Sequence, residues 1–274
     1  PEVKPEEKPE VKPEVKPEAK PEVKPEVKPE EKPEVKPEVK PEEKPEEKPE
    51  VKPEEGNNNN QNNNNNQNNN NNNQQEAKTV VDSFKTIENN QQVILVTSKG
   101  YGTNNAQIRT FDKTDGKWKE LKNINGKIGK DGFAKQMSEE VTQSPRGKYT
   151  IGMAFGRQGN PGTKLKWHDI QPNDVWVDDS KSELYNTLQQ KPSNGRWNSA
   201  ENMNIPAYDY GFVINYNTDR VAGKGSAIFF HVSNTWTAGC TGASKQDVID
   251  ILKWIEPAKN PVIIQAPESE LGNY

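Results

Sequence analysis

The feature that most limits what this chain can fold into is a strict N-terminal repeat, in which proline returns at every fourth residue from Pro1 to Pro53. Each proline fixes φ and lacks an N–H donor, so neither a helix nor a sheet can extend through such a segment. The repeat reads Pro-Glu-X-Lys, with Val, Glu or Ala at X, and has no apolar face to bury. We therefore expect residues 1–55 to form an extended, disordered spacer rich in polyproline II.

A second low-complexity segment follows at residues 56–78 and consists mainly of Asn and Gln. It offers no core residues, and we expect a disordered linker. The N-terminal third of the chain is thus predicted to lie outside any fold. Residues 79–274 contain short runs of Val, Ile, Leu, Trp and Tyr separated by Gly, Asn, Pro and Asp, and their number suits one domain.

Charge and residue counts exclude several classes of protein. The net charge of the chain is −4, of which residues 1–55 carry −6, so the remainder is close to neutral at +2 and lacks the basic excess of a nucleic-acid binder. One Cys and two His exclude an intrachain disulfide and argue against a zinc site, and we expect no metal or cofactor. No apolar run approaches the ~18 residues of a membrane span. The chain opens at Pro1 without a visible signal peptide, and we interpret it as a mature or truncated form.

Most apolar runs in the expected domain have the length and residue types of β-strands. An Asp115-Gly116 turn predicts a hairpin between two of them. One segment predicts a helix: Ser244 is a suitable N-cap, a helical apolar stripe follows, and Pro257 ends it. Residues 180–189 predict a second, weaker helix. The fold class is therefore mostly β, with one helix directly after the cysteine. The predicted strands are residues 92–97, 106–112, 117–121, 148–155, 174–177, 210–216, 227–232 and 261–265.

The chemistry is concentrated in the segment AIFFHVSNTWTAGCTGAS at residues 227–244. His231 ends a predicted strand and Cys240, the only cysteine, follows nine residues later, a spacing that fits a strand-turn return. A thiolate is the attacking form of cysteine, and a neighbouring imidazole can remove its proton. The amides of Gly239 and Cys240 would serve as oxyanion donors, and the helix after Ser244 would add positive potential.

The alternative is ordinary packing, because a lone Cys or His is more often an inert core residue. The spacing of His231 and Cys240 alone favours catalysis and inert packing about equally. An enzyme of this kind predicts a Cys240 that reacts faster than free cysteine. His168 has no counterpart in this chemistry, and we expect it at the surface.

The element Thr237-Ala238-Gly239-Cys240 after His231 resembles the signature of the L,D-transpeptidase (YkuD-like) family. Residues 144–149 (SPRGKY), Tyr216-Asn217 and the PVIIQ run at 261–265 are also similar to segments of that branch. The sequence departs from the commonest family form in having Ala238 where a second histidine stands, and in a shorter His-to-Cys loop.

The resemblance implies a β-rich catalytic fold and cysteine acyl transfer on peptidoglycan stem peptides. Carried over by position, Cys240 is the nucleophile, His231 the base, Gly239 and Cys240 supply oxyanion amides, and Thr237 takes the family's Ser/Thr position. A substrate groove would be lined by Tyr208, Tyr210, Tyr216 and Trp236, whose alternative role is packing. The resemblance further implies a monomeric enzyme outside the bacterial cell, in the wall or envelope, with the repeat as a spacer or a tether through the wall.

Cross-linking has four alternatives. Resolution of the thioester by water would make the protein an L,D-carboxypeptidase, and the sequence does not separate the two. A non-catalytic, wall-associated structural protein would leave the thiol unreactive. A sortase needs an arginine after the cysteine, whereas the last one here is Arg220, and NlpC/P60-like hydrolases place cysteine before histidine.

Overall fold

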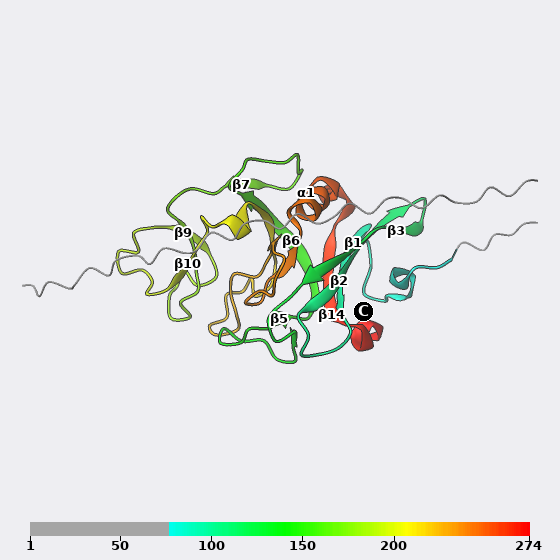
Figure 1. Cartoon of the computed structure of the whole chain (residues 1–274), viewed down its shortest axis with the longest axis horizontal. Coiled ribbons are helices and arrows are strands. Elements are labelled where there is room, and N and C mark those ends of the chain that lie inside the picture. The colour runs from blue at the N-terminus through cyan, green and yellow to red at the C-terminus, as the bar shows by residue number, and fades with distance from the viewer. Residues whose placement is uncertain (1–76) are drawn as a thin grey trace, which may run out of the picture. The chain divides into compact units, whose positions relative to one another are not determined.

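A computed structural model describes residues 77–274, so the spacer at 1–55 and nearly all of the linker at 56–78 lie outside the described residues. The described part is mostly β, with fourteen strands, one α-helix and four short 3-10 helices (Figure 1). The single α-helix follows Cys240, which confirms the predicted fold class. No helix in residues 77–274 combines the length and apolar character needed to span a bilayer.

The main sheet closes on itself. Strand β6 pairs with β14 through residues 147–150 and with β11 through residues 151–156, so eight of its nine strands form a ring of pairings and β7 adds to β6. Such closure removes the exposed edges of an open sheet. In sheet order the strands are β11 (Tyr210–Ile214), β12 (Phe229–Val232), β13 (Thr241–Ala243), β3 (Lys117–Lys127), β2 (Asn105–Thr114), β1 (Gln92–Ser98), β14 (Val262–Pro267), β6 (Gly147–Gly156) and β7 (Trp167–Asp169).

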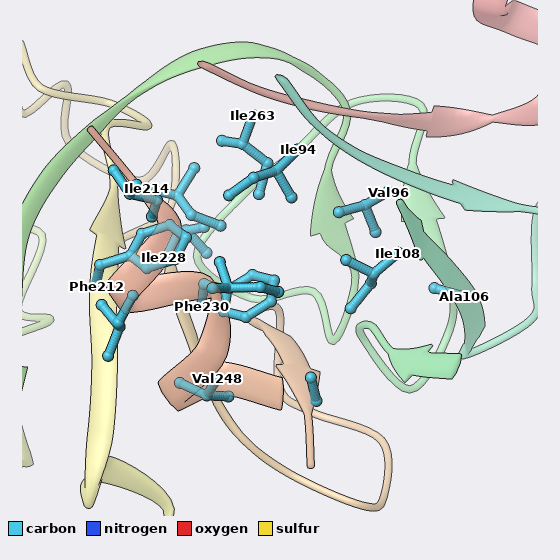
Figure 2. Packing of buried hydrophobic residues seen from close by; sticks show 14 of the residues in the cluster. Ile94, Val96, Ala106, Ile108, Phe212, Ile214, Ile228, Phe230, Val248 and Ile263 are labelled. Atoms are coloured by element: carbon cyan, nitrogen blue, oxygen red, sulfur yellow. The ribbon is translucent and has the colours of Figure 1, made fainter. Parts of the chain in front are cut away.

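The largest apolar core lies between this sheet and the helix α1 (Lys245–Trp254), and Figure 2 shows part of it. Phe212 and Phe230 stack at its centre, with ring centroids 4.9 Å apart. The helix contributes the predicted stripe, since Val248, Ile251 and Leu252 are buried there. Each such side chain stabilises the fold by about 1.5–3 kcal/mol through burial. The core therefore fixes α1 against the strands that carry Cys240 and His231.

Local signals set the ends of these elements. The Ser244 side chain accepts a hydrogen bond from the Asp247 N–H at 3.2 Å, as predicted for the N-cap. The helix ends at Trp254, before Pro257 opens the 3-10 helix η3 (Pro257–Lys259). The Asp115-Gly116 turn has φ of 51° and 77° and joins β2 to β3, which confirms the hairpin.

A second apolar cluster on β1, β2 and β14 is covered by the two ends of the described chain. The 3-10 helix η1 (Val80–Ser83) contributes Val81, and η4 (Glu268–Asn273) leads to Tyr274. The Tyr274 carbonyl accepts from the Thr86 N–H at 2.6 Å, and the Tyr274 ring packs on Phe84.

The segment between β7 and β11 forms a small three-stranded sheet of β8 (Asp174–Val177), β9 (Leu188–Gln190) and β10 (Ala200–Asn202), followed by the 3-10 helix η2 (Pro206–Tyr208). The helix expected at residues 180–189 is wrong. Asn186 takes a left-handed φ of 56°, and the Asp179 carboxylate accepts from the Lys181 N–H at 3.0 Å, so turns lead into β9 instead. Two further short strands, β4 (Phe133–Ala134) and β5 (Ser144–Pro145), pair with each other.

Candidate active site

His231 and Cys240 are brought together by two neighbouring strands, β12 and β13. The strands are parallel, with His231 opposite Gly242, so the expected strand-turn return is replaced by a connection that crosses back before β13 begins. The connection is fixed at its middle, because the Thr237 N–H donates to the Ile128 carbonyl at 3.1 Å and the Thr237 carbonyl accepts from the Lys130 N–H at 2.9 Å. Cys240 thus enters β13 at a defined position beside β12.

The backbone around the cysteine is held by two hydroxyls. Thr237 Oγ1 donates to the Cys240 carbonyl at 2.6 Å and accepts from the Gly239 N–H at 3.2 Å. Ser144 Oγ donates to the Gly239 carbonyl at 2.6 Å and accepts from the Gly129 N–H at 2.9 Å. Gly239 has a φ of 154°, which L side chains rarely adopt, and an added Cβ would lie 3.0 Å from the Gln143 carbonyl oxygen. The Gly239 amide, expected as an oxyanion donor, is engaged by Thr237 in this state.

Cys240 is buried, with 7% of its surface exposed. Its Sγ donates to the Ala227 carbonyl at 3.2 Å and accepts from the Phe229 N–H at 3.3 Å. Burial raises the pKa of the thiol, the charge of Glu201 raises it further, and the Phe229 N–H lowers it. The sulfur is therefore a protonated thiol that is hydrogen-bonded to Phe229, the first residue of β12, and to Ala227 just before that strand. The sequence had led us to expect a thiol activated by His231.

His231 is equally buried, at 7% exposure. Burial lowers its pKa to about 4, and hydrogen bonding to the backbone of Val232 and Ala207 acts in the opposite direction. Its Nδ1 lies 3.0 Å from the Val232 carbonyl oxygen, an acceptor that holds the proton on Nδ1. The other nitrogen, Nε2, then carries the lone pair, as a base requires. The ring of Tyr208 meets that of His231 edge-on at 5.1 Å and fixes its plane.

One pocket of about 490 Å³ joins these groups. It is lined by Cys240, His231 and four further residues expected from the sequence, namely Gly239, Thr237, Tyr208 and Trp236. Trp236 is 48% exposed at the opening, where Lys130 Nζ lies 5.5 Å from its ring centre. Tyr208 is buried on the opposite wall, in contact with Phe155 and Phe229.

The structure places other candidates elsewhere. Tyr216 does not line this pocket: its hydroxyl donates to the Lys224 carbonyl at 2.6 Å and its ring packs on Tyr149. Tyr210 packs in the main core under Lys245. His168 is half-buried rather than free at the surface, and its Nε2 lies 2.6 Å from Asp174 Oδ2.

The family follows from comparison with known proteins. The model of the L,D-transpeptidase catalytic domain, YkuD, matches residues 102–264, which is more than half of the chain and includes the whole pocket-forming segment around Cys240. The chain belongs to the YkuD L,D-transpeptidase family. No curated protein matches it. A solved structure, Bd1075 of Bdellovibrio bacteriovorus, is similar at 14% identity with a TM-score of 0.34, over 67% of this chain and 52% of that one. This chain thus spans about half the length of that solved chain.

Three groups at the site were not among the residues singled out from the sequence. Ser144 stands in the SPRGKY segment that carried the family resemblance, but nothing local indicated that its hydroxyl would bind the Gly239 carbonyl. Hydrogen bonding to the Ala207 backbone raises the pKa of His231, and the Glu201 carboxylate lines the same pocket. Both come from the segment between β7 and β11, where short irregular elements give no periodic signal.

Proposed function

We propose that this domain forms peptidoglycan cross-links by cysteine acyl transfer, with Cys240 as nucleophile and His231 as base. The observation that supports this most is the pocket itself, which is lined by the only cysteine of the chain and by a histidine whose Nδ1 is bound to the Val232 carbonyl, beside the Thr-Ala-Gly-Cys element. The match to an L,D-transpeptidase catalytic domain supplies the substrate class, the stem peptides of peptidoglycan. We place the enzyme outside the bacterial cell, where that substrate lies.

The proposed reaction begins when Cys240 Sγ leaves the Ala227 carbonyl and turns to His231. The thiol proton passes to Nε2, and Sγ attacks the carbonyl carbon between an L-residue and a terminal D-residue. The C–N bond breaks, the imidazolium returns its proton to the departing amine, and a thioester remains. An amine of a second stem peptide then attacks the thioester carbonyl and gives a proton to His231. The C–S bond breaks, His231 returns that proton to the departing sulfur, and a new amide bond and the free thiol remain.

Local backbone geometry supports the charge changes in these steps. The Phe229 N–H already points at Sγ from 3.3 Å and stabilises a thiolate. The Val232 carbonyl and the Ala207 backbone favour the imidazolium. The Cys240 amide remains the proposed oxyanion donor, and the Gly239 amide joins it only if it releases Thr237 Oγ1.

The deciding experiment is mass analysis of muropeptides incubated with the full chain and with Cys240→Ala. Cross-linked dimers made only by the wild type support transpeptidation. Trimmed monomers without dimers identify an L,D-carboxypeptidase, in which water replaces the acceptor amine. Unchanged muropeptides with both proteins would refute an enzymatic role and leave the wall-associated structural alternative.

A further inference from the structure

The pocket contains acidic groups that the proposed reaction does not use, and one of them, Glu201 on β10, is hydrogen-bonded to Tyr208 beside His231. Glu201 is partly buried and lines the pocket with Cys240 and His231. Its Oε1 accepts a hydrogen bond from the Tyr208 hydroxyl. Burial raises the pKa of Glu201, as do the charges of Asp178 and Glu139, while the Tyr208 hydroxyl lowers it by favouring the ionised form.

Tyr208 connects this carboxylate to both reacting groups. Its hydroxyl is bound to Glu201, and its ring stands perpendicular to that of His231, with ring centroids 5.1 Å apart. It also belongs to the same apolar cluster as Cys240. The arrangement places an acidic group in the pocket that Cys240 and His231 line.

No opposite charge in the pocket neutralises Glu201. Among the described residues that line it, none is Lys or Arg, whereas Glu139, Glu140 and Asp178 are also acidic. Glu139 is itself fixed, since its two oxygens accept from the hydroxyls of Tyr185 and Ser226. A negative charge near a buried sulfur opposes formation of a second negative charge there, and a low local dielectric strengthens the effect.

We propose that Glu201, held by the Tyr208 hydroxyl, is a positioning residue that keeps Cys240 in its thiol form while the pocket is empty. The charge of Glu201 raises the pKa of Cys240 beyond what burial alone achieves. Two titratable groups interact electrostatically with Cys240, namely Tyr208 from η2 and Glu201 from β10, and His231 from β12 lines the same pocket. Cys240 then loses its proton only when a bound peptide brings its carbonyl to the sulfur. Because the thiol stays protonated until then, an exported enzyme is protected from oxidation and alkylation at this residue.

The test is the pH dependence of Cys240 alkylation by iodoacetamide, followed by intact-protein mass in the full chain. The proposal rests on Cys240 as the nucleophile of the proposed function. Because the alkylation assay needs no peptidoglycan, its failure can be distinguished from failure of the proposed function. Glu201→Gln removes the charge and can still accept from Tyr208. Tyr208→Phe keeps the charge and removes the hydrogen bond. Glu183→Gln removes a charge from an exposed residue outside the pocket.

We expect Glu201→Gln to lower the pKa of the thiol by about one unit, which gives tenfold more thiolate. Because nucleophilicity falls with pKa, alkylation at neutral pH should rise about threefold. Tyr208→Phe should move the profile to lower pH by less than Glu201→Gln does, because the carboxylate loses only the hydrogen bond that favours its ionised form. Glu183→Gln should not move the profile. The proposal is overturned if the Glu201→Gln profile coincides with that of the wild type. It is also overturned if Tyr208→Phe shifts the profile downward as far, because loosened packing would then explain both.

Discussion

Ser144→Ala tests whether one buried hydroxyl organises the backbone next to the nucleophile. Ser144 is fully buried, its hydroxyl donates to the Gly239 carbonyl at 2.6 Å, and it accepts from the Gly129 N–H at 2.9 Å. Alanine leaves both backbone groups without this partner. Each neutral backbone group left unpaired costs about 1–2 kcal/mol, so we expect a loss of about 2–4 kcal/mol in the free energy of unfolding. The Cys240 carbonyl keeps its bond from Thr237 Oγ1 and adds nothing to this loss.

The assay is urea unfolding followed by tryptophan fluorescence, with thermal unfolding as a second measure. For a domain of this size, the expected loss corresponds to a fall in Tm of roughly 4–16 °C. Thr142→Ala is the matched control, because Thr142 lies two residues away and its hydroxyl binds the exposed Asp131 carboxylate. We expect that variant to lose less than about 0.5 kcal/mol. If Ser144→Ala is no less stable than Thr142→Ala, the hydroxyl does not have the structural role assigned to it.

Three further predictions follow from the same contacts. His231→Ala should lower the rate of Cys240 acylation, read by intact-protein mass, by about 10²–10⁴-fold, and an unchanged rate would show that the base is misassigned. Burial lowers the pKa of His231 from about 6.5 to about 4, so the unfolded state takes up a proton first as pH falls. The free energy of unfolding should therefore decline by roughly 3 kcal/mol between about pH 6.5 and 4. Urea titrations of His231→Gln should lack this decline. Ser244→Ala removes the N-cap of α1 and should cost about 1 kcal/mol in urea unfolding, whereas no loss would mean that the cap is not needed.

The elements that the sequence predicted well are those whose signal is local and repeated. The strand β1 is a continuous apolar run, β2 alternates, and the apolar stripe of α1 has a helical period. The Asp115-Gly116 turn has a residue pair that suits its left-handed φ values. The Cys240 and His231 pair was found through its spacing and the Thr-Ala-Gly-Cys element, and its catalytic assignment stays a prediction.

What the sequence did not predict depends on contacts between distant residues. Ser144 meets Gly239 across 95 positions of the chain, and Glu201 reaches the pocket only because β10 pairs with β8. The parallel course of β12 and β13 was also missed, because a short polar connection normally indicates a hairpin. Burial of the thiol likewise depends on η2, whose Tyr208 and Ala207 pack in the same cluster as Cys240, and nothing near Cys240 in the sequence encodes it.

This burial changes what an active cysteine should look like before substrate arrives. Ionising either buried group alone would place an unpaired charge in the pocket, and the raised pKa of Cys240 together with the lowered pKa of His231 expresses that cost. Moving one proton from Cys240 to His231 creates two opposite charges within one pocket and no net charge, which costs less than either charge alone. Proton transfer and attack on a bound carbonyl are then favoured together. We therefore predict that iodoacetamide alkylates wild-type Cys240 at pH 7 more slowly than free cysteine, while an acylating stem peptide reacts at a rate that depends on His231. Alkylation faster than free cysteine would show a thiolate already formed in the empty pocket and would refute this order of events.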